Sequence, residues 1–232
     1  MKTEMIVALD VPSLSVMREK VALLGDAVSY YKVGLELFTQ EGPATLDVLK
    51  DAGKRVFLDL KLHDIPRTVA RAVAAAARQG ADMLTVHASG GPGMLAAAAA
   101  AAREAGEARP SIVAVTALTS LDQQDLQRIG VERALDDHVL KLADMATGEG
   151  VDGLVCSPLE LSALRIRLGT APILVAPGVR PAGTDAGDQK RMATPASAAR
   201  DGASFIVVGR PVLDTIDPVA SAQAIREELA VA

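Results

Sequence analysis

The chain has 232 residues and half of them are apolar, so it can bury one sizeable core, and we expect a single domain over residues 1–232. The net charge is −5 and neither terminus carries a run of Lys or Arg, which argues against nucleic acid and anionic membranes as partners. Cys156 is the only cysteine, which excludes an intrachain disulfide, fits a reducing compartment and leads us to expect a cytoplasmic protein.

The first apolar run, at residues 5–9, is too short for a membrane span or a signal-peptide core and indicates a strand. With later β-branched runs it gives predicted strands at 5–9, 30–33, 56–60, 83–87, 112–116, 153–156, 173–176 and 205–208. Helical patterns lie between them, among them 13–24, 43–52, 68–79, 218–229 and an alanine-rich run at 94–102. This alternation is typical of a parallel sheet, and without a Ser/Gly-rich linker it favours closure into one (β/α)8 barrel.

Polar residues or glycines lie at the carboxyl end of nearly every predicted strand. An open, doubly wound sheet would give the same alternation of strands and helices, but these positions favour the barrel, because its strand ends converge on one mouth where active sites lie. The positions are Asp10, Lys32, Asp59, Lys61, His87, Thr119, Ser120, Ser157, Gly178 and Gly209.

Asp59 and Lys61 are two residues apart on a predicted strand, so regular alternation points both side chains to the same face. An ion pair that only closes the end of the barrel would explain two such charges. Asp64 follows in the next loop, however, and Lys32 and Asp10 end the two preceding strands. Five charges exceed what a structural pair requires, so we predict a preorganised electrostatic field that contains a proton donor.

A second group of residues fits a phosphate site, which barrels usually form from the loops after strands seven and eight. Gly209 and Arg210 follow the last strand and offer a backbone N–H beside a guanidinium group. A glycine-rich loop over residues 177–189 follows the seventh strand. Either segment alone would fit an ordinary surface loop, but together they favour phosphate binding.

Residues 59–68 read DLKLHDIPRT, which resembles the D-x-K-x-x-D-I-P-x-T signature of orotidine 5′-phosphate decarboxylases. The resemblance continues in VALD at 7–10, KVG at 32–34, VTALTS at 115–120, PGVRP at 177–181, GDQ at 187–189 and VVGR at 207–210. Leu62 stands where many relatives carry Phe, and Arg67 where Asn is frequent, but neither position has a predicted chemical role.

The resemblance implies that Lys61 donates a proton to C6 of the substrate, with Asp59, Asp64 and Lys32 completing the catalytic network. It also implies a homodimer in which the partner subunit's Asp64 completes each active site. Further implied substrate contacts are Asp10, Lys32 and Thr68 at the ribose, Thr119 and Ser120 at the pyrimidine, Arg180, Gln189, Gly209 and Arg210 at the phosphate, and Ile65.

The implied reaction is loss of CO2 from orotidine 5′-phosphate to give UMP, the last step of de novo pyrimidine biosynthesis, without a metal or another cofactor. No H-x-H or H-E-x-x-H spacing is present, and Cys156 ends an apolar strand as a small buried residue would.

One rival function is that of a Mg²⁺-dependent sugar-phosphate decarboxylase or aldolase that shares D-x-K-x-x-D. The I-P-x-T continuation and Gln189 argue against it. The other rival is a non-catalytic nucleotide-binding barrel, which would not need the costly array of charges at the strand ends.

Overall fold

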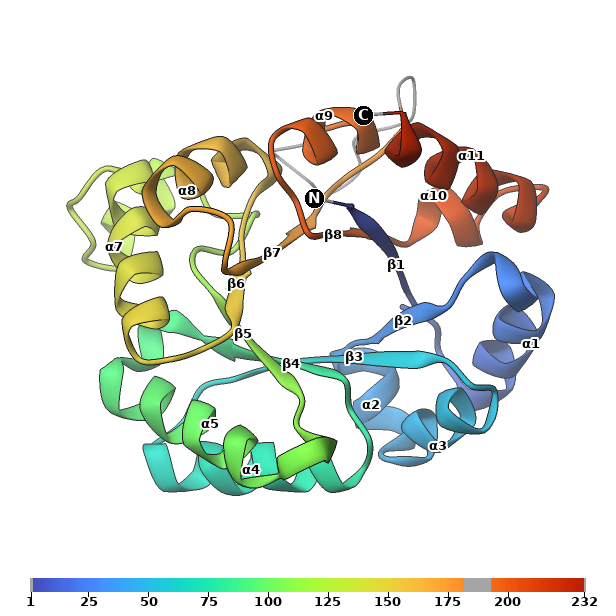
Figure 1. The fold of residues 1–232 in the computed structure, drawn as a ribbon, viewed down its shortest axis with the longest axis horizontal. Helices are drawn as coiled ribbons and strands as arrows, with labels where there is room; N and C mark the ends of the chain where they lie inside the picture. Colours follow the sequence, from blue (N-terminus) through green and yellow to red (C-terminus); the bar gives the residue numbers. More distant parts are fainter. Residues whose placement is uncertain (1, 182–192, 232) are drawn as a thin grey trace.

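In the computed structural model, which describes residues 2–181 and 193–231, eight parallel strands close into a barrel in chain order (Figure 1). Each strand pairs with the next, and the last pairs with the first from Glu4↔Phe205 to Val7↔Val208. This arrangement confirms the predicted (β/α)8 barrel, with half of the strand ends shifted by one or two residues. The strands are β1 Glu4–Ala8, β2 Tyr30–Val33, β3 Arg55–Leu62, β4 Met83–His87, β5 Ser111–Val115, β6 Gly153–Val155, β7 Ile173–Pro177 and β8 Phe205–Val208.

Helices surround the barrel (Figure 1). The helix predicted from residue 68 begins two residues earlier, because Ile65 is extended and Pro66 has the fixed φ that suits a first turn. None of the helices in the two described ranges is long and apolar enough to cross a membrane. The helices are α1 Leu14–Leu24, α2 Leu35–Glu41, α3 Ala44–Asp51, α4 Pro66–Arg78, α5 Pro92–Glu104, α6 Gln123–Arg128, α7 Leu135–Gly148, α8 Leu161–Leu168, α9 Pro195–Arg200, α10 Arg210–Leu213 and α11 Pro218–Ala230.

The hydrophobic core has one layer inside the barrel and another between the strands and the helices. Small and branched side chains dominate both layers, as the composition predicts, yet aromatic rings also fill the interior. Tyr30 and Phe205 meet edge to face with ring centroids 5.6 Å apart, near Phe57 in the same layer. In the outer layer the alanine-rich α5 lies beside α4, and its Ala98 and Ala102 are fully buried, as expected for close helix packing.

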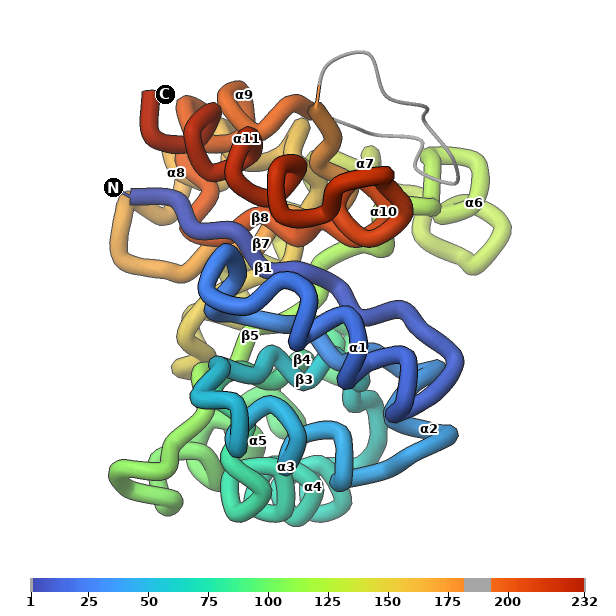
Figure 2. Tube along the Cα trace, turned by 90° about the vertical axis from the view of Figure 1, so that its right-hand side faces the viewer, coloured from blue at the N-terminus to red at the C-terminus, as the bar shows by residue number. Residues whose placement is uncertain are grey.

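The carboxyl ends of the strands form the mouth of the barrel. Figure 2 shows the N-terminus on one side of the molecule and α6, which follows β5, on the other. Strand β3 is irregular on this side: Leu58 pairs with Leu84 and Leu62 with Val86, so four steps on β3 match two steps on β4. This β-bulge contains Asp59 and Lys61, and it is therefore the local structure that positions the predicted catalytic pair.

Candidate active site

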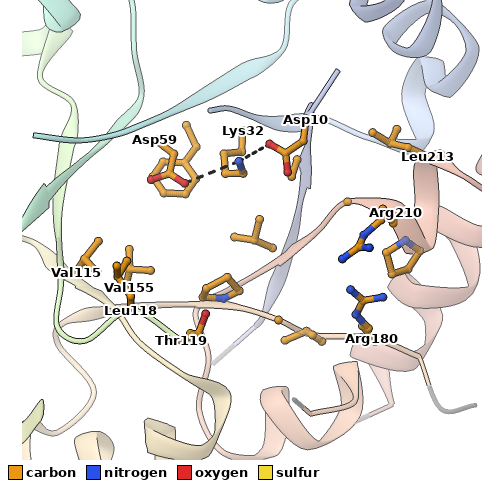
Figure 3. Close-up of a pocket in the computed structure, with 18 of the residues that line it drawn as sticks. Asp10, Lys32, Asp59, Val115, Leu118, Thr119, Val155, Arg180, Arg210 and Leu213 are labelled. Carbon is orange, nitrogen blue, oxygen red and sulfur yellow. Dashed lines mark hydrogen bonds and ion pairs between the residues drawn. The ribbon is translucent and has the colours of Figure 1, made fainter. Parts of the chain in front are cut away.

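A cavity of about 630 Å³ opens at the mouth of the barrel. Charged groups and apolar side chains both line it, as expected for a pocket that binds a small polar molecule. In Figure 3 the carboxylate of Asp59 and the amine of Lys32 lie at one side of the cavity, and Val115, Val155, Leu118 and Thr119 lie at another. Of the residues predicted from sequence, the cavity is lined by Asp10, Lys32, Asp59, Lys61, Thr119, Arg180, Gly209 and Arg210.

Four of the predicted charges form one continuous row. The Lys32 ammonium lies 2.8 Å from Asp10 Oδ1 and 3.8 Å from Asp59 Oδ2. The Lys61 ammonium lies 2.8 Å from both carboxylate oxygens of Asp59. Because positive and negative groups alternate, each charge has an opposite neighbour, and the row is preorganised before any ligand enters.

The close approach of Lys32 and Asp10 depends on Gly34. A Cβ atom at this position would lie 2.9 Å from Lys32 Nζ and 3.2 Å from Asp10 Oδ1, so the ammonium group would have to move. The sequence signal for this requirement is the KVG segment at 32–34.

A threonine that the sequence analysis did not select also contacts the charged row. The hydroxyl of Thr85, on β4, donates to Asp59 Oδ1 at 2.9 Å and accepts from the backbone N–H of Lys61 at 2.7 Å. Lys61 has φ of 50°, a left-handed conformation that no other non-glycine residue of the described ranges adopts. Such a conformation is unfavourable for a lysine and is retained only where surrounding contacts enforce it.

Two of the predicted phosphate residues, Arg180 and Arg210, lie at the side of the cavity away from Asp59. Figure 3 shows the guanidinium groups of Arg180 and Arg210 pointing toward the same part of the cavity. Two guanidinium groups that converge in this way suit a dianionic phosphate. Gly209 lies between β8 and Arg210, while Gln189 lies outside the described residues.

Other predicted residues are not brought into the cavity of their own chain. Asp64, Ile65 and Thr68 are exposed on the loop after β3 and the first turn of α4, and Ser120 is exposed on a turn after β5. None of the four lines the cavity. Asp64 instead accepts a hydrogen bond from the backbone N–H of Ile65 at 2.6 Å.

Two histidines lie next to the charged row, their ring centroids 5.4 Å apart: His63 after β3 and His87 at the end of β4. Burial lowers the pKa of His87, and the neighbouring His63 and Lys61 lower it further. Among the described residues there is no cluster of three or more His, Cys, Asp or Glu side chains that could hold a metal ion. Cys156 is buried, as its apolar strand predicts.

Lys20 is another residue that sequence reasoning missed. It lies on α1 at the edge of the cavity, where its ammonium donates to the carbonyl of Leu213 at 2.8 Å. No local motif marks this lysine, because its position depends on the tertiary contact with the Leu213 carbonyl at the end of α10.

The comparisons with known proteins agree with this geometry. The sequence model of the Orotidine 5′-phosphate decarboxylase / HUMPS family matches residues 3–225. The chain is 51% identical to the orotidine 5′-phosphate decarboxylase of Moorella thermoacetica, over 98% of this chain and 92% of that protein. It is 46% identical to that of Marinomonas sp., over 94% and 93%. The structure of orotidine 5′-phosphate decarboxylase from Lactobacillus acidophilus superposes with a TM-score of 0.88 at 36% identity, covering 99% of both chains. The chain therefore belongs to the orotidine 5′-phosphate decarboxylase family.

Proposed function

We propose that this chain decarboxylates orotidine 5′-phosphate to UMP and CO2, with the Lys61 ammonium as the proton donor to C6. The activity follows from membership of the family and from close relatives of that name over nearly the whole chain. The observation that carries the proposed role of Lys61 is its place in the lining of the cavity, 2.8 Å from both oxygens of Asp59. The Asp59 carboxylate in turn lies across the cavity from two converging guanidinium groups.

The proposed step breaks the bond between C6 and the substrate carboxylate, and the electron pair remains on C6 in the plane of the ring. The π system cannot delocalise this pair, so a nearby positive charge is the available stabiliser. One charge pair at 4 Å and an effective dielectric of 20 contributes about 4 kcal/mol, or about a thousandfold in rate. The proton of the Lys61 ammonium then adds to C6, and the amine is reprotonated from solvent.

Asp59 supports this step in two ways. It holds the Lys61 ammonium through two hydrogen bonds, and it also lies 3.8 Å from Lys32, which itself pairs with Asp10. The row is therefore fixed before substrate binds, and little reorganisation is needed as charge develops on C6.

Arg180 and Arg210 are proposed to hold the substrate phosphate, together with Gly209 and Gln189. Since their guanidinium groups lie across the cavity from Asp59, a nucleotide anchored there extends its pyrimidine toward Lys61. The binding energy of the phosphate contacts, which are remote from C6, then restricts the substrate to the reactive orientation. Thr119 lines the part of the cavity that the base would occupy.

We further propose that the chain is one domain and forms a homodimer with shared sites. Asp64 and Ile65 support this proposal, because they lie in an exposed segment outside the cavity of their own chain, and the Ile65 side chain is apolar. An isologous dimer would bury that segment and bring the partner subunit's Asp64 to the charged row. The charge and cysteine content support a cytoplasmic enzyme that binds neither nucleic acid nor membranes.

One assay tests the activity directly. The purified chain is mixed with orotidine 5′-phosphate, and loss of the substrate absorbance is followed together with formation of UMP. We expect one UMP for each substrate consumed. Complete inactivity of a folded preparation that still binds UMP would instead favour a nucleotide-binding protein without turnover.

A further inference from the structure

The Thr85 hydroxyl contacts both members of the Asp59–Lys61 pair. Thr85 lies in the apolar strand β4 and its side chain is fully buried. A hydroxyl can donate one hydrogen bond and accept others at the same time, and here it does both. It donates to Asp59 Oδ1 and accepts from the Lys61 backbone N–H, at 2.9 and 2.7 Å.

The β-bulge explains why this hydroxyl is needed. Between Leu58 and Leu62 the β3–β4 register shifts, so the backbone N–H of Lys61 has no regular partner in the ladder. An unpaired N–H group in a partly buried position is costly, and Thr85 supplies the missing acceptor. The same contact restrains Lys61 in its left-handed conformation, which a lysine does not adopt without such support.

The other hydrogen bond of Thr85 restrains the carboxylate. Asp59 Oδ1 receives the Thr85 hydroxyl at 2.9 Å and the Lys61 ammonium at 2.8 Å. The hydroxyl therefore fixes the carboxylate oxygen and the lysine backbone from a single atom. Losing it would free both ends of the pair, although neither charge would be removed.

We propose that Thr85 is a positioning residue for decarboxylation, which sets the Lys61 ammonium relative to C6 by holding Asp59 and the Lys61 backbone together. This inference rests on the proposed role of Lys61. Thr85 itself does not line the cavity, so we expect it to affect the chemical step and not substrate binding.

The test compares Thr85→Val, which keeps the shape but removes the hydroxyl, with Thr85→Ser, which keeps the hydroxyl. For Thr85→Val we expect kcat to fall about 10- to 100-fold, the effect of losing a hydrogen bond to a charged group. We expect KM, and the Kd for UMP measured by calorimetry, to change by less than about twofold. Thr85→Ser should recover most of kcat.

A matched control distinguishes the effect of losing the positioning contact from the general effect of losing a buried hydroxyl. Thr45 is also fully buried, and its hydroxyl donates to the carbonyl of Gly42 at 2.8 Å, on α3 and away from the cavity. Thr45→Val should lower Tm yet leave kcat unchanged. If Thr85→Val keeps wild-type kcat, or if Thr85→Ser loses as much kcat as Thr85→Val, the proposal is wrong.

A second pair of variants covers the case in which Thr85→Val does not fold. Thr85→Ser and Thr85→Ala share the lost methyl group and differ only in the hydroxyl, so their ratio of kcat gives the same comparison. Equal kcat values overturn the proposal. If Thr85→Ala is unfolded as well, the hydroxyl is needed only for folding, and the proposal is also overturned. An inactive but folded wild-type chain would contradict the proposed decarboxylase activity itself, whatever Thr85 does.

Discussion

The Lys61 ammonium and the Asp59 carboxylate form a pair in which the lysine is the more accessible member. Both carboxylate oxygens lie 2.8 Å from the ammonium, and the side chain of Lys61 is 30% exposed while that of Asp59 is 12% exposed. Both side chains line the cavity, and the ammonium offers the more accessible surface to a substrate there. Such a pair suits a proton donor that is held in place by its counter-ion.

Lys61→Ala is expected to lower kcat by at least about a thousandfold, since it removes both the stabilising charge and the proton donor. UMP should still bind, because Arg180 and Arg210 lie across the cavity from Asp59. Steady-state kinetics and calorimetry measure the two effects. Lys50→Ala is the control: Lys50 pairs with Asp82 at 3.3 Å outside the cavity, so its loss should leave kcat unchanged. Near-normal turnover of Lys61→Ala would remove this lysine from the mechanism.

Arg210→Ala is expected to raise KM for orotidine 5′-phosphate by about 10- to 100-fold, the effect of losing a charged hydrogen bond to the phosphate. For substrates that lack the phosphate, the KM of the wild type and that of the variant should not differ. Arg167→Ala serves as the control, because Arg167 pairs with Asp144 at 2.8 Å on the surface and away from the cavity. An unchanged KM in Arg210→Ala would place the phosphate elsewhere.

Activity is expected to be the same before and after treatment with EDTA. In the proposed mechanism Lys61 supplies the positive charge that a metal ion would contribute in the rival sugar-phosphate enzymes. The measurement is kcat/KM with orotidine 5′-phosphate in chelator, then after addition of Mg²⁺. Loss of activity that only Mg²⁺ restores would favour the rival reading of the D-x-K-x-x-D segment.

The barrel and the gathering of charges at its mouth were predictable from sequence. Strand periodicity depends on local residues, and closure brings all strand ends together whatever the details of the packing. Asp10, Lys32, Asp59 and Lys61 therefore met as predicted. Regular alternation along the strand does not fully explain the positions of Asp59 and Lys61, however, because β3 has a β-bulge at that point.

The contributions of Thr85 and Lys20 were not predictable in the same way. A threonine suits any strand, and only the shifted β3–β4 register reveals that Thr85 faces both Asp59 and the Lys61 backbone. Lys20 reaches the cavity edge through the packing of α1 near Leu213, almost two hundred residues away in sequence. Contacts of this kind depend on tertiary packing, for which a single sequence has no local signal.

The exposed position of Asp64 leads to a prediction about the assembly. In a dimer with shared sites, Lys61→Ala and Asp64→Asn homodimers each carry two damaged sites, so both should be nearly inactive. After dissociation and reassociation of an equal mixture, one site of each heterodimer joins the intact Lys61 of one chain to the intact Asp64 of the other. Half of the dimers are mixed, so activity should approach about a quarter of the wild-type value per chain.

A second mixture, Lys61→Ala with Asp59→Asn, is the matched control. Asp59 and Lys61 contact each other within one chain, so every site of this heterodimer keeps one lesion and no activity should return. Subunit exchange is verified in both mixtures by mass spectrometry of differently labelled chains. Recovery in the first mixture alone supports a site completed by the partner subunit's Asp64. If exchange is complete and the first mixture stays inactive, Asp64 serves its own chain, and the exposed loop after β3 must move to reach the cavity.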